Sequence, residues 1–315
     1  MKNIYKITIV TIMFISLLCL NGCSINNKNN KLTIIASSFP GYDFARAITK
    51  DSNNIEVKML LNPGTEMHNY EPTPQDIIKI NNSKMFIYVG GDSDEWINDI
   101  IGDIDTSKTK LVKLMDLVNV VEEEHVKGME VEDEEEEEET EYDEHVWTSP
   151  KNAITIINKI KDIIIDIDKD NQNLYENNAL NYINKLNVID NEIKNIVNNG
   201  IRKEIIIGDR FPFRYFTDEY NLRYYAAFPG CSEQTEASAK TISFLIDKVK
   251  NDNIPVVFHI ELSKGNIAKT ISEETGAKVL EFNSAHNISQ KDFDRGVTYI
   301  DIMNNNIKAL KEALN

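Results

Sequence analysis

The sequence is poor in cysteine and in basic residues. Of its three cysteines, Cys19 and Cys23 lie near the N-terminus, so Cys231 is the single cysteine in the rest of the chain. An intramolecular disulfide framework is therefore excluded, and stability must come from a hydrophobic core. Lysine and arginine total 34 against 51 acidic residues, a net charge of −17. A nucleic-acid partner is not expected, because it would need a basic face.

The negative charge is concentrated in one segment. Residues 122–144 hold 15 acidic residues and one lysine, a local charge of −14 out of −17, so the remaining body is only mildly acidic. We predict that residues 122–142 form a disordered, solvated insert, since like charges repel one another. The alternative is a cation-collecting segment, whose negative field would raise the local cation concentration and the association rate.

The N-terminus has the pattern of an export signal. Residues 1–22 combine two lysines, no acidic residue and an apolar stretch that is short for a membrane span. They run into "LNGC", which resembles the bacterial lipobox, in which the cysteine is lipidated. We therefore predict a signal peptide at 1–22, lipidation of Cys23 and a polar tether at 23–30. The alternative is a plain signal peptide with a chance cysteine.

Short β-branched runs alternate with helical segments on both sides of a long helical region. Strands are predicted at residues 32–39, 55–61, 84–90, 109–117, 203–208, 223–228, 255–262 and 277–282. Helices are predicted at residues 41–50, 74–83, 95–104, 149–167, 171–199, 213–221, 235–252, 266–276 and 298–314. This alternation predicts an α/β fold with mainly parallel sheets covered by helices on both faces.

The helix predicted at 171–199 is about 40 Å long, more than one small sheet needs. We therefore expect it to join two lobes. The predicted organisation is an N-terminal α/β lobe at 31–168, a linking helix at 169–199 and a C-terminal α/β lobe at 200–315. A cleft between such lobes is the usual place for a ligand.

The five histidines form neither H-x₃-H nor H-E-x-x-H pairs, so the local zinc-protease signal is absent. His68 follows the second predicted strand, at the edge where ligand groups collect in open α/β sheets. His145 lies just before a helix that Ser149 caps and Pro150 begins. His286 lies in the loop after the last predicted strand. Spacing alone leaves two possibilities: three ordinary loop histidines, or three that converge on one site.

Two motifs favour convergence. "LNPGTEMHNYEPTPQDI" at 61–77 and "EHVWTSPKNA" at 144–153 resemble motifs of the zinc- and manganese-specific solute-binding lipoproteins of bacterial ABC importers. In that family each motif supplies one metal-binding histidine, which corresponds to His68 and His145. The similarity covers nearly the whole mature chain. It implies two α/β lobes joined by one long rigid helix, with the metal site in the cleft between them.

One expected histidine is missing. The family commonly takes a third histidine from a motif that here reads "GDRFPFRYF" at 208–216, where Arg210 stands near the expected position. A guanidinium cannot ligate a cation. We expect His286 to supply the missing imidazole and Arg210 to pair with a carboxylate such as Glu236 or Glu261. The alternative is that His286 points away and the site has two histidines.

The predicted donors favour Zn²⁺, because three imidazoles with one carboxylate or water suit a tetrahedral zinc site. Mn²⁺ is the alternative and would prefer more oxygen ligands. The predicted metal ligands are His68, His145, His286 and, as the fourth, Glu261. Cys231 is interpreted as a small buried apolar residue in preference to a thiolate ligand.

The resemblance implies a monomeric receptor, anchored by a lipid at Cys23 on the outer face of the cell membrane. It would capture Zn²⁺ and deliver it to an ABC permease with its ATPase, by binding and release and without catalysis. A zinc-dependent hydrolase is one alternative, for which Glu66 is the only nearby general base. A surface adhesin is another, since some relatives carry that label.

Overall fold

The computed structural model describes residues 31–65, 67, 70–130, 141–232, 234 and 236–315. Within them, Leu32–Asn315 form one compact unit. The predicted signal peptide at 1–22 and the tether that begins at Cys23 lie outside the described residues. No helix among the described residues has both the length and the apolar composition that a membrane span requires.

The first sheet is parallel, with the strand order β2-β1-β3-β4. Its strands are β1 (Leu32–Ala36), β2 (Ile55–Met59), β3 (Met85–Tyr88) and β4 (Lys110–Lys113). The accompanying helices are α2 (Phe39–Ile48), α3 (Pro74–Asn81) and α4 (Ile97–Ile100). All four residues of β3 are buried, as expected of an inner strand that is apolar on both faces.

The second sheet repeats this arrangement with the order β6-β5-β7-β8, again parallel. Its strands are β5 (Glu204–Arg210), β6 (Arg223–Phe228), β7 (Val256–His259) and β8 (Lys278–Glu281). The helices of this half are α7 (Arg214–Tyr220), α8 (Ala239–Asn251), α9 (Asn266–Thr275), α10 (Gln290–Asp294) and α11 (Tyr299–Leu314). The run Ile205–Ile206–Ile207 is fully buried in the central strand β5.

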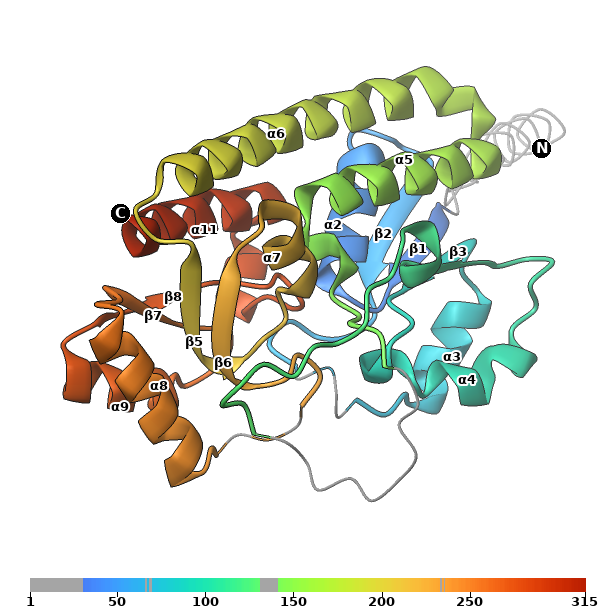
Figure 1. Cartoon of the computed structure of the whole chain (residues 1–315). Coiled ribbons are helices and arrows are strands. Elements are labelled where there is room, and N and C mark those ends of the chain that lie inside the picture. Colours follow the sequence, from blue (N-terminus) through green and yellow to red (C-terminus); the bar gives the residue numbers. More distant parts are fainter. Residues whose placement is uncertain (1–30, 66, 68–69, 131–140, 233, 235) are drawn as a thin grey trace, which may run out of the picture. The chain divides into compact units, whose positions relative to one another are not determined.

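Two long helices lie side by side, with α6 (Gln172–Asn199) running along both halves of the chain and α5 (Pro150–Ile167) over the first half (Figure 1). Helix α5 begins as predicted, with Ser149 Oγ accepting a hydrogen bond from Asn152 N at 3.3 Å. Helix α6 has 28 residues, a length of about 42 Å. It packs against α2, α5, α7 and α11. The predicted α/β fold with two parallel sheets and a long connecting helix is confirmed.

One continuous core connects the two halves. The largest cluster of buried apolar side chains includes Ile34 of β1, Ile205 of β5 and Leu186 of α6. Because α6 buries its apolar face against both halves, we expect little bending about it. The predicted lobe boundaries, 31–168 and 200–315, stay a prediction, since Leu32–Asn315 pack as one unit.

The first part of the acidic insert is ordered, which corrects the predicted disorder over 122–142. Residues 121–130, here called the acidic arm, lie against the second half of the chain. Met129 is buried, and the backbone N–H of Glu130 donates to the carbonyl of Ala227 at 2.9 Å. Glu123 Oε1 accepts hydrogen bonds from the backbone N–H groups of Gly230 and Cys231. The apolar residues within the arm, together with these paired carboxylates, offset the charge repulsion. Residues 131–140 lie outside the described residues.

Candidate metal centre

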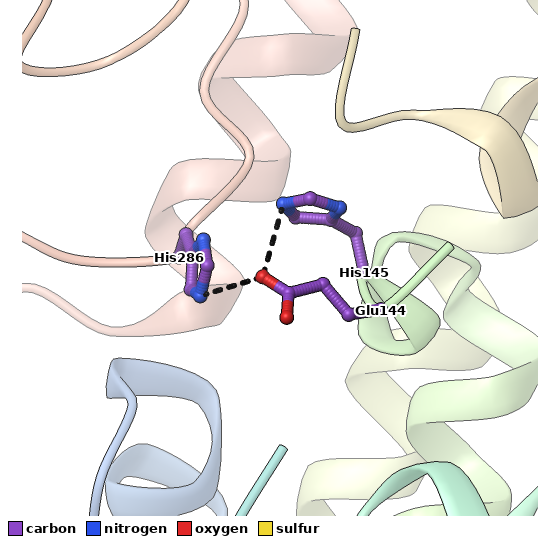
Figure 2. A group of neighbouring side chains, drawn as sticks. All are labelled: Glu144, His145 and His286. Atoms are coloured by element: carbon purple, nitrogen blue, oxygen red, sulfur yellow. Dashed lines mark ion pairs between the residues drawn. The ribbon is translucent and has the colours of Figure 1, made fainter. Parts of the chain in front are cut away.

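Three buried side chains converge on one point. Glu144 Oε1 lies 3.7 Å from His286 Nε2 and 4.0 Å from His145 Nε2, and one donor atom from each residue lies within 4.8 Å of the others. Figure 2 shows both imidazoles directed at this oxygen, one from the segment before α5 and one from the loop after β8. The expected convergence of His145 with His286 is therefore present, and His286 does not point away.

The cluster fits a small divalent cation. Zinc bonds of about 2.0–2.1 Å in a tetrahedral site place neighbouring donor atoms about 3.3 Å apart. The separations of 3.7 and 4.0 Å from Glu144 Oε1 to the two nitrogens are longer than this, and all three donors lie within 4.8 Å of one another, so side-chain movements of about 1 Å would bring them to bonding distance. Imidazole nitrogens and a carboxylate oxygen are typical zinc ligands. All three residues are less than 9% exposed, which keeps competing water away.

Glu144 is held in place by the turn after β3. Ser93 donates to Glu144 Oε2 twice, from its backbone N at 3.0 Å and from Oγ at 2.9 Å. These bonds leave Oε1 directed at the two histidines. A side chain at Gly91 would collide with Glu144, so glycine is required where the turn passes the carboxylate. Sequence reasoning missed Glu144 because it was taken as the end of the acidic run; its position directly before His145 was the available signal.

His145 is oriented by Asp143. The Oδ1 atom of Asp143 accepts a hydrogen bond from His145 N at 2.8 Å and lies 3.2 Å from His145 Nδ1. A proton on Nδ1, assigned from this contact, leaves the Nε2 lone pair available for a cation. Asp143 is fixed in turn, because its carbonyl accepts a hydrogen bond from the Tyr215 hydroxyl at 2.7 Å.

Glu261 lies in the wall of the same cavity but outside the donor cluster. Its carboxylate accepts hydrogen bonds from Ser284 and from His286 N, so its oxygens face the loop that carries His286. The carboxylate that lies beside the two histidines is therefore Glu144, whereas Glu261 as a ligand stays a prediction.

Trp147 contacts both imidazole rings. The centroid of its ring system lies 5.5 Å from that of His145 and 5.1 Å from that of His286.

His68 lies outside the described residues. Its described neighbours Thr65 and Met67 line the cavity that His145 and His286 also line. The carbonyl of Thr65 accepts a hydrogen bond from Asn287 Nδ2 at 2.6 Å. The segment leading to His68 is thus attached to the segment that follows His286. This cavity has a volume of about 30 Å³, which is enough to hold a water molecule or a metal ion.

Arg210 also lines this cavity, and its pairing with a carboxylate stays a prediction. Among the ion pairs between described residues, none joins Arg210 to Glu236 or Glu261. Glu261 is occupied by the His286 loop, and Glu236 is exposed. Arg210 Nη1 donates to the carbonyl of Ser232 at 3.4 Å.

Further carboxylates make the surroundings of the cluster strongly negative. Burial and repulsion from Glu144 raise the pKa of Asp94 to about 7, and burial and repulsion from Asp143 raise the pKa of Glu123. Burial, together with repulsion from Glu144, Asp143 and Glu123, raises the pKa of the Cys231 thiol well above its ordinary value, so the thiol stays protonated at neutral pH in the metal-free chain. A cation entering the site would relieve this repulsion. The interpretation of Cys231 as a small buried apolar residue stays a prediction, since the residue is half-buried.

Comparisons with known proteins find similarity over most of the chain. Residues 34–313 match the family described as "Zinc-uptake complex component A periplasmic". The high-affinity zinc uptake system protein ZnuA of Bacillus subtilis is 32% identical over 294 residues, which cover 92% of this chain and 90% of that protein. The zinc-binding lipoprotein AdcA of Streptococcus pneumoniae is 30% identical over 298 residues, 94% of this chain but 58% of AdcA.

Solved structures show the same fold. The crystal structure of the Zn(II)-bound ZnuA-like domain of Streptococcus pneumoniae AdcA superposes with a TM-score of 0.74 at 28% identity, covering 90% of this chain and 99% of that one. The laminin-binding protein Lmb of Streptococcus agalactiae has the same TM-score at 20% identity. That lower identity shows the fold alone, so it carries no argument for adhesion.

Proposed function

The chain belongs to the family of zinc-uptake complex component A, and on that premise we propose that it captures Zn²⁺ outside the cytoplasm and delivers it to an ABC permease with its ATPase. The observation that carries this proposal is the buried cluster of Glu144, His145 and His286. Zinc is the cargo of such a protein, so function consists of binding and release.

The proposed ligands of Zn²⁺ are Glu144, His145, His286 and His68. The first three are supported by the distances between their donor atoms. His68 is supported by its motif and by the position of its neighbours Thr65 and Met67 in the cavity wall. Two or three imidazoles favour Zn²⁺ over Mn²⁺, which prefers additional oxygen ligands.

Binding without catalysis is supported by the size of the site. A cavity of about 30 Å³ is small beside the several hundred Å³ that are usual for pockets that bind small organic molecules. The hydrolase alternative would also require a water-activating base beside an open metal position. Glu144, the carboxylate nearest the two histidines, is instead held towards them by Ser93.

We further propose that the protein acts as a monomer attached to the outer face of the cell membrane by a lipid at Cys23. The support is the "LNGC" sequence at 20–23 and the similarity to the lipoprotein AdcA. The shared core along α6 supports release through local movement of the ligand loops in preference to a wide opening.

Calorimetric titration of the purified full-length chain with Zn²⁺ tests the function. One tight site is expected, and its affinity should fall by more than about 100-fold in His145→Ala and in His286→Ala, beyond the effect of losing an outer partner. A wild type that binds no zinc, or turnover of ester or peptide substrates that depends on zinc, would contradict the proposal.

A further inference from the structure

The carboxylate of Glu261 is directed at the loop that carries His286. Its Oε2 accepts a hydrogen bond from Ser284 N at 2.7 Å. Its Oε1 accepts from Ser284 Oγ at 2.5 Å and from His286 N at 3.1 Å. A carboxylate can accept about four hydrogen bonds. Glu261 accepts three from this one loop, two from Ser284 and one from His286.

The backbone on both sides of these contacts is strained. Leu262, next to Glu261, has φ = 59°, and Ala285, next to His286, has φ = 61°. Residues with a side chain rarely adopt this left-handed conformation, and they keep it only where the surrounding contacts enforce it. The loop conformation that presents His286 therefore depends on such contacts.

Other contacts fix the loop as a whole but not the His286 amide. Trp147 Nε1 donates to the carbonyl of Ser284 at 2.7 Å, and Asn306 exchanges hydrogen bonds with the backbone of Asn283. The His286 N–H itself donates to Glu261 Oε1 and to Ser284 Oγ, a hydroxyl that Glu261 also binds. The orientation of His286 thus depends on Glu261 both directly and through Ser284.

We infer that Glu261 is a positioning residue for zinc binding: it holds Ser284–His286 in the strained turn that aims the His286 imidazole at Glu144, and it does not itself bind the metal. This inference rests on the proposed function. The two carboxylates of the site then have different roles: Glu144 binds the cation, and Glu261 holds the loop that carries His286.

A double-mutant cycle on the full-length chain tests the inference. Glu261→Gln keeps the shape of the side chain but replaces one acceptor oxygen by an NH₂ group, which cannot accept a hydrogen bond from Ser284 or His286. We expect zinc affinity to fall about 10- to 100-fold, as for other outer partners of a metal ligand. In a His286→Ala background, Glu261→Gln should cause little further loss, because Glu261 acts through His286. Asp190→Asn, at a buried carboxylate on α6 that accepts a hydrogen bond from Tyr220, is the matched control.

Two further readouts separate positioning from a general loss of structure. Without metal, the amides of Ser284 and His286 should exchange hydrogen faster in Glu261→Gln than in wild type or Asp190→Asn. With Co²⁺ as the probe, the absorption spectrum of Glu261→Gln should move towards that of His286→Ala.

Equal losses of affinity from Glu261→Gln in both backgrounds would overturn the inference and favour Glu261 as a ligand. Unchanged affinity of the single variant would also overturn it. A wild type that binds no zinc would instead overturn the proposed function, and this inference with it.

Discussion

Glu144 Oε1 lies 3.7 Å from His286 Nε2, although one residue precedes α5 and the other follows β8, the last strand of the second sheet. Both groups are buried, and Ser93 and Glu261 hold them in place. A cation between them would link the two halves of the chain at the cavity. It would raise the free energy of unfolding, and more so the further its concentration exceeds the dissociation constant.

Glu144→Gln should weaken zinc binding by more than about 100-fold, beyond the effect of losing an outer partner. The substitution removes the negative charge and leaves the shape unchanged. Glu122→Gln is the control, because Glu122 is an exposed acid in the same segment and the change of net charge is identical. Competition with a chromophoric chelator measures both affinities. Similar affinities of the two variants would exclude Glu144 as a ligand.

Asp143→Asn should lower zinc affinity about 10- to 100-fold, because Asp143 fixes the orientation and the tautomer of His145. The fold should remain, since the amide can still accept from the His145 backbone. Circular dichroism checks the fold and the same competition assay gives the affinity. An unchanged affinity would mean that His145 does not need this partner.

The stability of the metal-free chain should depend on pH through Asp94. The pKa of Asp94 rises from 3.8 to about 7 in the folded chain, so between these values the folded chain keeps a proton that the unfolded chain releases. Its contribution to the free energy of unfolding is therefore largest at low pH and is lost as the pH rises towards 7.

Thermal unfolding of wild type and Asp94→Asn measures this effect. Wild type should lose more stability than the variant between about pH 5 and pH 8, by up to a few kcal/mol. Parallel pH profiles of the two proteins would show that Asp94 keeps its ordinary pKa.

Gly128→Ala should detach the acidic arm. Gly128 has φ = 94°, and a Cβ there would collide with the ring of Phe244. We expect a loss of about 1–3 kcal/mol in the free energy of unfolding. Gly102→Ala is the control, since Gly102 has open space and no positive φ. Denaturant unfolding compares the two, and equal stabilities would contradict the observed packing of the arm.

The sequence predicted the fold well because its signals are local. Apolar periodicity reveals α6, and Ser149 with Pro150 marks the start of α5. Helix α10 was missed because it has five residues. Disorder was assigned to the whole acidic insert because composition hides the contacts of Val121, Val126 and Met129 with the core.

The site was predicted less completely, because its chemistry depends on contacts between distant segments. The motifs around His68 and His145 are local, and the substitution at Arg210 directed attention to His286. By contrast, the bond from Ser93 to Glu144 and the bonds from the His286 loop to Glu261 join segments far apart in the chain. A local sequence pattern does not predict hydrogen bonds between residues far apart in the chain, so the roles of Glu144 and Glu261 had to come from the structure.

The most direct test is an anomalous difference map at the zinc absorption edge, from crystals of the zinc-loaded full-length chain. We predict one peak within about 2.3 Å of Glu144 Oε1, His145 Nε2 and His286 Nε2, with the carboxylate of Glu261 still accepting hydrogen bonds from the Ser284 and His286 amides. A peak bound by Glu261 but not by Glu144, or a peak away from both histidines, would contradict it.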